Sequence, residues 1–486
     1  MEVKHFGTVS SASDADMLKM EAASWVRKIG GQLEIDFDDS KGREREETKR
    51  VIDNMDSVLI NGTQLLLGRV YDSIGFNRIP DEILRQLVIS RVSQPASKLA
   101  TVTYLKSYYD EDVDLNAIYR YMDKLYNTQM EFAQQISVEH TSNILGGRLG
   151  IVFYDVTTLY FETSVTDALR EPGFSKDGRM TESQVVLGLL VSEGGYPLSY
   201  SLYNGKQHEG FTMIPMIDDF TSRFSMDNAP VIVADSGLMS RKNISLLRQG
   251  GYKYVIGARI RNATDQVKDW ILSRQMNDGE TCETCLPDGD RLVLGYSSSR
   301  AAKDAYNRNR GVERLRKAYS SGRLTKENVN RRGYNKFLEI SKDVEVTIVE
   351  DKITEDRRWD GLKGYITNTD LDARSVITQY HGLWVVERAF RVSKGKLEAR
   401  PIFHFTERRI EAHICICFIA YKVYKELERL IAEKRIGMSV DKVLDVAKTV
   451  VTIRVDMPQN GELYTKTLFL TKEHQRIMPL FDIAKG

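Results

Sequence analysis

Between Gly147 and about residue 259, strand-like and helix-like segments follow one another in an order that few folds accommodate. Three β-rich runs come first, in "GRLGIVFYDVTTLYFET" and "SQVVLGLLVSEGGYPLSYSLYNG", the last two joined by a turn at residues 193–195. A helix, the apolar strand "VIVAD", a short helix closed by Gly250 and a last strand complete the series. This order predicts an α/β domain with a mixed sheet and one further helix to come.

That further helix is delayed by an insertion at residues 260–370. Within it, residues 300–336 carry 12 Lys or Arg against three Asp or Glu, and such a local excess favours contact with phosphate. The runs "ISKDVEVTIVEDKI" and "GLKGYITNTD" predict two strands that pair with each other. We therefore expect a basic and partly β insertion, with Arg331 and Arg332 as candidate DNA contacts.

The residues before Gly147 predict helices. From Pro80 the pattern is helical, and Asp114 is an expected N-cap. Arg120 and Lys124 lie on the second of two short helices, which fits either a helix-turn-helix DNA reader or a plain helical bundle. The predicted divisions are a helical N-terminal domain (1–146), the first part of the α/β core (147–259), the insertion (260–370), the second part of the core (371–425) and a small C-terminal α/β region (426–486).

The composition excludes several classes of protein. The 69 basic and 68 acidic residues nearly cancel, so any basic surface is local. No apolar run approaches the ~18 residues that span a bilayer, and the N-terminus has no signal-peptide core, so we expect a cytoplasmic protein. Cys282 and Cys285 form one CxxC without a second pair to complete a zinc site, which favours a turn or small hairpin.

Three carboxylates occupy positions where α/β sheets place their sites. Asp155 lies inside the first strand, where a buried carboxylate is costly unless it is paired or bound to metal. Asp235 ends the strand "VIVAD", and Glu387 comes from the delayed helix. Alone, Asp235 is an ordinary turn or cap residue and Glu387 a solvated helix position. Together they predict a site for two Mg²⁺ or Mn²⁺ ions, because hard cations prefer carboxylate oxygens.

The delayed helix has an unusual stripe. Tyr380, Glu387 and Lys394 are spaced seven residues apart in "YHGLWVVERAFRVSKGK". At about 100° per residue, seven steps return to nearly the same helix face. A single helix would therefore line up a phenol, a carboxylate and an ammonium.

On these residues the chain resembles the DDE transposases of bacterial insertion sequences. The resemblance is to the cut-and-paste subgroup with a Tyr-(2)-Arg-(3)-Glu-(6)-Lys signature, which this chain matches at Tyr380, Glu387 and Lys394 but not at Leu383. It implies an RNase H-like mixed sheet with helices on both faces. It also implies metal-dependent cleavage of transposon-end DNA, joining of 3′-hydroxyls to target DNA, and a homodimer in the synaptic complex. Asp155, Asp235 and Glu387 match the metal-binding carboxylates.

The resemblance and the local charge predict further DNA contacts. Lys394 is expected to hold a phosphate, Tyr380 the backbone or a displaced base, and Trp384 a stacked base, although core packing of Trp384 fits equally. The remaining candidates are basic residues on or after the same helix, namely Arg388, Arg391, Arg400, His404, Arg408 and Arg409. Two alternatives stay open: an RNase H-like nuclease without strand transfer, and an inactive DNA-binding relative, for which Leu383 is the hint.

Overall fold

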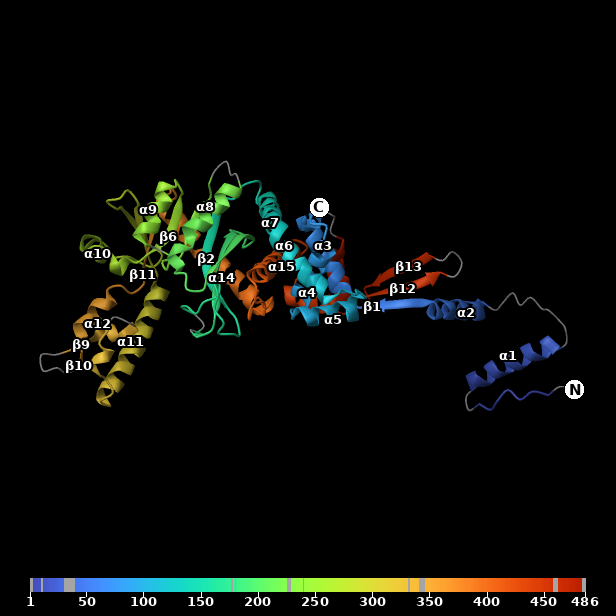
Figure 1. Cartoon of the computed structure of the whole chain (residues 1–486). Helices are drawn as coiled ribbons and strands as arrows, with labels where there is room; N and C mark the ends of the chain where they lie inside the picture. The colour runs from blue at the N-terminus through green and yellow to red at the C-terminus, as the bar shows by residue number, and fades with distance from the viewer. Residues whose placement is uncertain are drawn as a thin grey trace. The chain divides into compact units, whose positions relative to one another are not determined.

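The computed structural model divides into two compact units, residues 1–58 with 452–468 and residues 59–451 with 469–486 (Figure 1). Arg331 and Arg332 fall outside the residues that the structure describes. The described residues are 3–9, 12–29, 40–175, 178–179, 181–224, 229–238, 240–330, 333–340, 346–457 and 462–482.

The smaller unit joins segments from both ends of the chain. Strand β1 (Met55–Leu59) pairs with β12 (Val451–Met457), which pairs with β13 (Glu462–Leu468). Two helices precede them, α1 (Ala12–Ile29) and α2 (Ser40–Asp53). Residues 1–146 are therefore not helical throughout, since β1 belongs to a sheet with two strands from the C-terminal region.

The larger unit is built on an eight-stranded mixed sheet with the strand order β4-β3-β2-β5-β6-β11-β8-β7. Strands β2, β5 and β6 are parallel, and every other neighbouring pair is antiparallel. The predicted order of strands and helices from residue 147 to 259 is confirmed. The elements are β2 (Ile151–Tyr160), β3 (Gln184–Ser192), β4 (Pro197–Asn204), α8 (Met213–Arg223), β5 (Val231–Ala234), α9 (Arg241–Gln249) and β6 (Tyr254–Ala258).

Helices cover both faces of this sheet, as the α/β prediction requires. Along β2, Phe153 belongs to one buried apolar cluster and Tyr154 to a second, because successive side chains in a strand point to opposite faces. The Phe153 face packs against α13 (Ala373–His381) and α14 (Trp384–Arg391). The Tyr154 face packs against α8, α9 and α10 (Asp265–Leu272).

Part of the insertion extends the sheet. Strand β11 (Leu362–Thr367) pairs with β6 and with β8 (Arg291–Tyr296), and β8 pairs with β7 (Thr281–Cys285). The prediction that residues 340–353 pair with residues 361–370 is wrong. Instead, β9 (Leu338–Ile340) pairs with β10 (Val346–Ile348), beside α11 (Ser298–Ser320) and α12 (Glu350–Arg357).

The CxxC of the insertion is the end of a hairpin. Cys282 and Cys285 lie on β7, which turns into β8, and neither residue joins a metal-holding cluster among the described residues. The antiparallel pairing of β7 with β8 confirms the hairpin interpretation.

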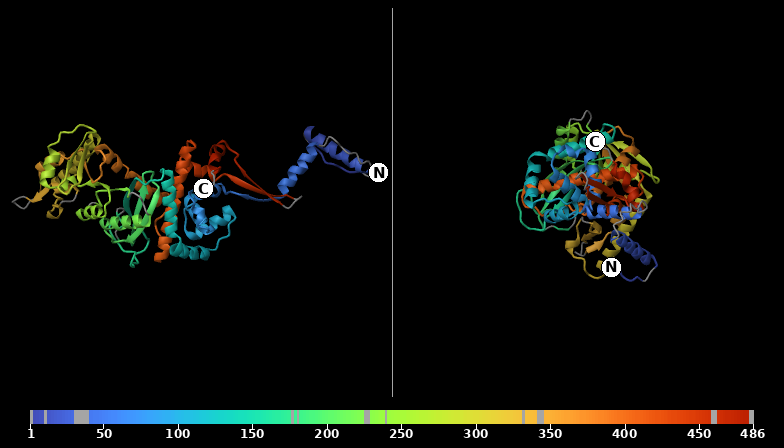
Figure 2. Two further views of the ribbon diagram at one scale, coloured as in Figure 1. Left: turned by 90° about the horizontal axis from the view of Figure 1, so that it is seen from above. Right: turned by 90° about the vertical axis from the view of Figure 1, so that its right-hand side faces the viewer.

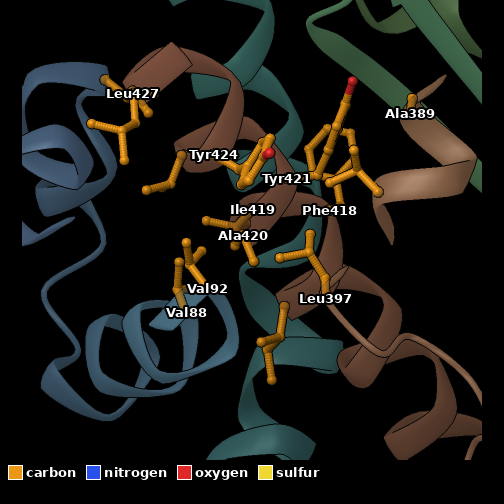
Figure 3. Packing of buried hydrophobic residues seen from close by; sticks show 14 of the residues in the cluster. Val88, Val92, Ala389, Leu397, Phe418, Ile419, Ala420, Tyr421, Tyr424 and Leu427 are labelled. Carbon is orange, nitrogen blue, oxygen red and sulfur yellow. The ribbon is translucent and has the colours of Figure 1, made fainter. Parts of the chain in front are cut away.

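One long helix ties the N-terminal helices to the sheet. α15 (Glu407–Glu433) packs against α4 (Glu82–Ser93), α6 (Leu115–Thr128) and α7 (Met130–Ile144), and it runs without a break through residue 425. Figure 3 shows Val88 and Val92 of α4 on one side of α15 and Ala389 of α14 on the other, and all three belong to one buried cluster. The remaining helices are α3 (Gly62–Ile74), α5 (Lys98–Tyr109), α16 (Val440–Ala447) and α17 (Lys472–Ile477).

The N-terminal helices of the larger unit form a bundle around α15, and Figure 2 shows α7 beside it. Asp114 caps α6 as expected, accepting a hydrogen bond of 3.1 Å from the backbone N–H of Ala117. Lys124, a candidate base reader, instead forms an ion pair of 2.6 Å with Asp81. None of the described helices is long and apolar enough to cross a membrane.

Candidate active site

Asp155 and Asp235 lie on neighbouring parallel strands. Tyr154 and Ala234 are the last residues in register between β2 and β5, and each aspartate is the next residue in its chain. Neighbouring strands are about 4.8 Å apart, so the two backbones run side by side here. Strand alternation places both carboxylates on the Phe153 face, which α13 and α14 cover.

Asp235 is held by a phenol and by the turn that follows β5. Its Oδ1 accepts hydrogen bonds from Tyr380 Oη at 2.9 Å and from the backbone N–H of Ser236 at 2.6 Å. Burial opposes the ionisation of Asp235, but these donors outweigh it and hold its pKa below the usual range. The carboxylate is therefore charged at neutral pH.

Tyr380 reaches Asp235 because β6 has a glycine beneath it. A Cβ on Gly257 would lie 2.5 Å from Tyr380 Oη, which is closer than real side chains approach. The tyrosine itself is buried, with 5% of its surface exposed. It is thus a partner of Asp235 in this structure, and its expected contact with DNA stays a prediction.

The single helix expected from Tyr380 to Lys394 is wrong. α13 ends at His381, α14 begins at Trp384, and Lys394 lies in a π-helical segment, Val392–Lys396. A Cβ on Gly382 would lie 2.4 Å from the ring of Phe153, so the junction sits directly on β2. Tyr380, Glu387 and Lys394 therefore occupy three successive segments and not one regular α-helix.

Lys363 is a residue of the site that the sequence pattern did not reveal. It lies on β11, and its Nζ is 4.2 Å from the centroid of the Tyr380 ring. Burial lowers the pKa of Lys363, with Arg300 adding to the effect, while the negative charges of Asp235 and Glu387 oppose it. Glu387, which is exposed, is thus electrostatically linked to Asp235 through one ammonium.

A fourth carboxylate approaches the same place. Glu209 belongs to "NGKQHEG", and a Cβ on Gly237 would lie 3.6 Å from Asp235 Oδ2 and 4.0 Å from Glu209 Oε2. Its neighbours in the sequence have structural partners, since Lys206 pairs with Glu171 at 3.1 Å and His208 accepts a hydrogen bond from the N–H of Gly210.

The donor chemistry of this face suits a hard divalent cation, because Asp155 and Asp235 directly follow the paired residues Tyr154 and Ala234 and both carry carboxylates. Within the described part of the chain, however, no three His, Cys, Asp or Glu side chains are close enough together to hold a metal ion. The two aspartates on neighbouring strands are therefore the candidates for a shared ligand, and Glu387 lies on α14.

A cleft of about 470 Å³ adjoins Lys363. Its lining brings together strands β8 and β11 with helices α11 and α13. Burial lowers the pKa of His381 in this cleft, with Lys363 and Arg300 contributing, so the histidine is neutral near pH 7. The basic lining residues are Arg300, Lys363, Arg374 and His381.

The other signature-region residues differ in accessibility. Trp384 has 56% of its surface exposed, so core packing does not explain it, whereas Leu383 is buried at 8%. Arg388 is engaged with Glu428 of α15, through an Nη1–Oε2 distance of 3.2 Å and a second contact. Arg391 is exposed and Lys394 is half-buried. Arg388 is therefore occupied within the protein, and Arg391 remains accessible.

The basic residues after the π-helical segment do not form one open surface. His404 is buried beside Tyr119 and His413, and burial with nearby Lys98 and Arg91 lowers its pKa to about 3. Arg409 pairs with Asp123 at 3.3 Å. Arg408 is exposed and Arg400 is half-buried. A neutral, buried His404 is not a phosphate ligand by charge, so the expected charged surface is reduced.

Much of the charge excess at residues 300–336 is neutralised within the insertion. Arg308 is buried and pairs with Asp360 at 2.5 Å, and Lys336 pairs with Asp356 at 2.6 Å. Arg316 pairs with Glu350 at 2.6 Å. Exposed basic residues on α11 for which no ion pair occurs among the described residues are Lys303, Arg310 and Arg314.

A family model and several solved structures are similar to this chain. A family model described as transposase DDE domain matches residues 147–422. Among solved structures, a piggyBac transposase synaptic complex with hairpin DNA is similar at 11% identity and a TM-score of 0.41, covering 78% of this chain and 70% of that one. A Mos1 transposase paired-end complex with left transposon end has 10% identity and a TM-score of 0.17, covering 36% and 58%. No curated protein sequence matches.

Proposed function

The chain belongs to the family of DDE transposases, and we propose that this DNA transposase cuts the ends of an insertion sequence and joins their 3′-hydroxyls to target DNA. The observation that carries the proposal is the adjacency of Asp155 and Asp235 on one face of the sheet, beneath the helices that bear Tyr380 and Glu387.

Each residue of the site has a distinct role in the proposal. Asp155, Asp235 and Glu387 would hold two Mg²⁺ or Mn²⁺ ions, with Glu387 approaching the aspartates when DNA is in place. Members of the family generally use divalent metal ions, which activate water and stabilise the leaving oxygen of a phosphodiester. Tyr380 orients Asp235 and keeps it ionised.

The covalent steps balance without any further reactant. In the first step a water oxygen bonds to phosphorus, the bond to the 3′-oxygen breaks, and that oxygen gains a proton. In the second step the 3′-hydroxyl oxygen bonds to a target phosphorus and displaces a target 3′-oxygen, which takes up the proton. Lys363 would hold a phosphate oxygen, since its Nζ lies 4.2 Å from the centroid of the Tyr380 ring and interacts electrostatically with Asp235 and Glu387.

DNA would contact the exposed side chains around the site. Arg391 and Lys394 are candidate phosphate ligands, and the exposed indole of Trp384 is a stacking surface for a base. Arg400 and Arg408 extend this surface, and DNA contact by Arg331 and Arg332 stays a prediction. We further propose that two copies act together, because two DNA ends must be joined to one target.

The test is cleavage and joining by purified protein. The wild type is incubated with Mg²⁺, target DNA and a labelled duplex that ends in the element's own terminal repeat, beside Asp235→Asn. The expected result is cutting and joining by the wild type, and binding without cutting by the variant. Asp265→Asn is the matched control, since the Asp265 side chain is 94% exposed on α10.

Two other outcomes of this experiment would indicate a different function. Cleavage without joining would identify a nuclease that shares the three carboxylates. Binding by wild type and variant with no cutting in Mg²⁺ or Mn²⁺ would identify an inactive DNA-binding relative.

A further inference from the structure

Two buried cations face a second cleft, of about 160 Å³, in the larger unit. Lys98 begins α5 with 5% of its surface exposed, and Arg91 near the end of α4 is 6% exposed. Both line the cleft. Buried lysine and arginine are costly unless an anion accompanies them.

Neither cation has an acidic partner in the part of the chain that the structure describes. Among the described residues, no Asp or Glu forms an ion pair or hydrogen bond with Arg91 or Lys98. Glu398 lines the cleft but is exposed. The other titratable lining groups are Arg400, Tyr119, His404 and His413.

Positive charge is concentrated around the cleft. Burial lowers the pKa of Lys98 to about 7, and the charge of Arg91 contributes. His413 is buried, and its Nε2 lies 3.2 Å from the carbonyl oxygen of Ala399. An anion in the cleft would relieve the repulsion between the two cations and favour the charged form of Lys98.

The size and rim of the cleft fit a nucleic-acid backbone. Its volume of 160 Å³ is about five times the roughly 30 Å³ of one water in the liquid, which leaves room for a tetrahedral phosphate. Leu99 and Phe403 also line it and are 64% and 60% exposed, so an apolar edge borders the cations. Sugars and bases can pack on such an edge while a phosphate enters.

The cleft is tied to the strand that carries Asp155. The N–H of Ile402 donates a hydrogen bond of 3.1 Å to the carbonyl oxygen of Tyr160, the last residue of β2. Arg400 stacks on the Tyr160 ring with 5.4 Å between guanidinium and centroid. Tyr160 is five residues from Asp155, or ~17 Å at ~3.3 Å per residue. A bound strand can therefore reach both places.

We propose that this cleft binds a backbone phosphate of the DNA on which the transposase acts, with Arg91 and Lys98 as its ligands. The inference rests on the proposed function and adds a phosphate-binding site contributed by α4 and α5, away from the carboxylates. Arg91 supplies a planar fork for two phosphate oxygens and Lys98 a point charge.

The experiment uses the full chain in EDTA, so that no cleavage occurs. Anisotropy of a labelled 30-bp duplex of arbitrary sequence is measured across a KCl series for wild type, Arg91→Met, Lys98→Met and the double variant. We expect each single change to weaken binding about tenfold, and the double variant to reduce the salt slope by ~0.9. Lys106→Met, an exposed lysine on the same helix, should bind within twofold of wild type.

Thermal unfolding without DNA supplies an independent readout. Replacing an unpaired buried cation by methionine should leave the midpoint unchanged or raise it. Unfolding of both methionine variants would overturn the inference, because the cations would then serve the fold. Unchanged DNA affinity and salt slope would overturn it as well.

Two controls separate the possible failures. If inorganic phosphate raises the midpoint of the wild type but the double variant binds the duplex normally, the cleft is a site for free phosphate and the inference is wrong. If the wild type binds and cuts DNA while the variants match it, only this inference fails. Absence of any duplex binding by the wild type would reject the proposed function together with it.

Discussion

Tyr380 Oη lies 2.9 Å from Asp235 Oδ1 and donates a hydrogen bond to it. The two residues come from segments 145 positions apart, one on α13 and one after β5. The hydroxyl of Tyr380 therefore donates to the Asp235 carboxylate and lowers its pKa, so removing the hydroxyl should change the ionisation of Asp235.

Tyr380→Phe should destabilise the protein at neutral pH and slow cleavage. A hydrogen bond to a charged group contributes about 1.5–3 kcal/mol, and its loss raises the pKa of Asp235. Because the wild-type pKa is depressed, its stabilising effect is present above the ordinary aspartate range and is lost as pH falls through the folded-state pKa. Urea unfolding should therefore show a larger difference between the wild type and the variant at pH 7 than at pH 3. Tyr365→Phe, a neighbouring ring, is the control.

Gly257→Ala should displace Tyr380. The added Cβ would lie 2.5 Å from the phenol oxygen, and overpacking of this kind costs about 1–3 kcal/mol. We expect a lower free energy of unfolding and reduced cleavage. Gly150→Ala provides the comparison, since nothing lies within 4 Å of its Cβ. Equal stability of the two variants would refute the contact.

Arg388 and Arg391 should separate stability from DNA binding. Arg388→Ala breaks the ion pair with Glu428 and should lower stability by about 1 kcal/mol while leaving duplex affinity unchanged. Arg391→Ala should weaken duplex binding without changing the unfolding midpoint. The exchange of Arg388→Glu with Glu428→Arg should recover stability. Loss of affinity in Arg388→Ala with normal stability would reverse the assignment.

Glu411 should make the protein less stable as pH rises. Burial, with a contribution from Glu407, raises its pKa to about 7. An acid with a raised folded-state pKa binds more protons when folded, so stability falls between its unfolded value, about 4.3, and 7. Glu411→Gln should therefore raise the thermal midpoint more at pH 8 than at pH 4. The exposed Glu407→Gln is the control, and equal shifts at both pH values would contradict the burial effect.

The exposed basic residues of α11 should supply the affinity of the insertion for DNA. Replacing Lys303, Arg310 and Arg314 by glutamine should weaken duplex binding and flatten its salt dependence. Arg316→Gln with Lys317→Gln, which removes residues paired with Glu350 and Glu313, should leave affinity nearly unchanged. Equal losses from both sets would mean that the ion pairs open when DNA binds.

The part of the fold that local patterns determine was predictable. Runs of apolar residues, with the turn and capping residues that bound them, predict the order from β2 to β6, the cap at Asp114 and the end of β5 before Asp235. The pairing of β11 with β6 and of β1 with β12 was not, because the partners are about a hundred residues or more apart.

The same limit applies to the site. Asp155, Asp235 and Glu387 could be selected because carboxylates in those settings are unusual. Lys363 is one lysine among many in the sequence, and only the tertiary contact with Tyr380 distinguishes it. The break between α13 and α14 depends on the approach of Gly382 to Phe153, which periodicity does not encode.

The late position of β11 and α14 sets an order of assembly during synthesis. A ribosome releases Asp155 and Asp235 with β2 and β5, but β11 begins at residue 362 and Glu387 follows it. Until then the edge of β6 lacks its partner strand, and the aspartates lack Tyr380, Lys363 and the third carboxylate. Under the proposed function, a nascent or truncated chain therefore cannot cut DNA, and cutting begins only when most of the polypeptide exists.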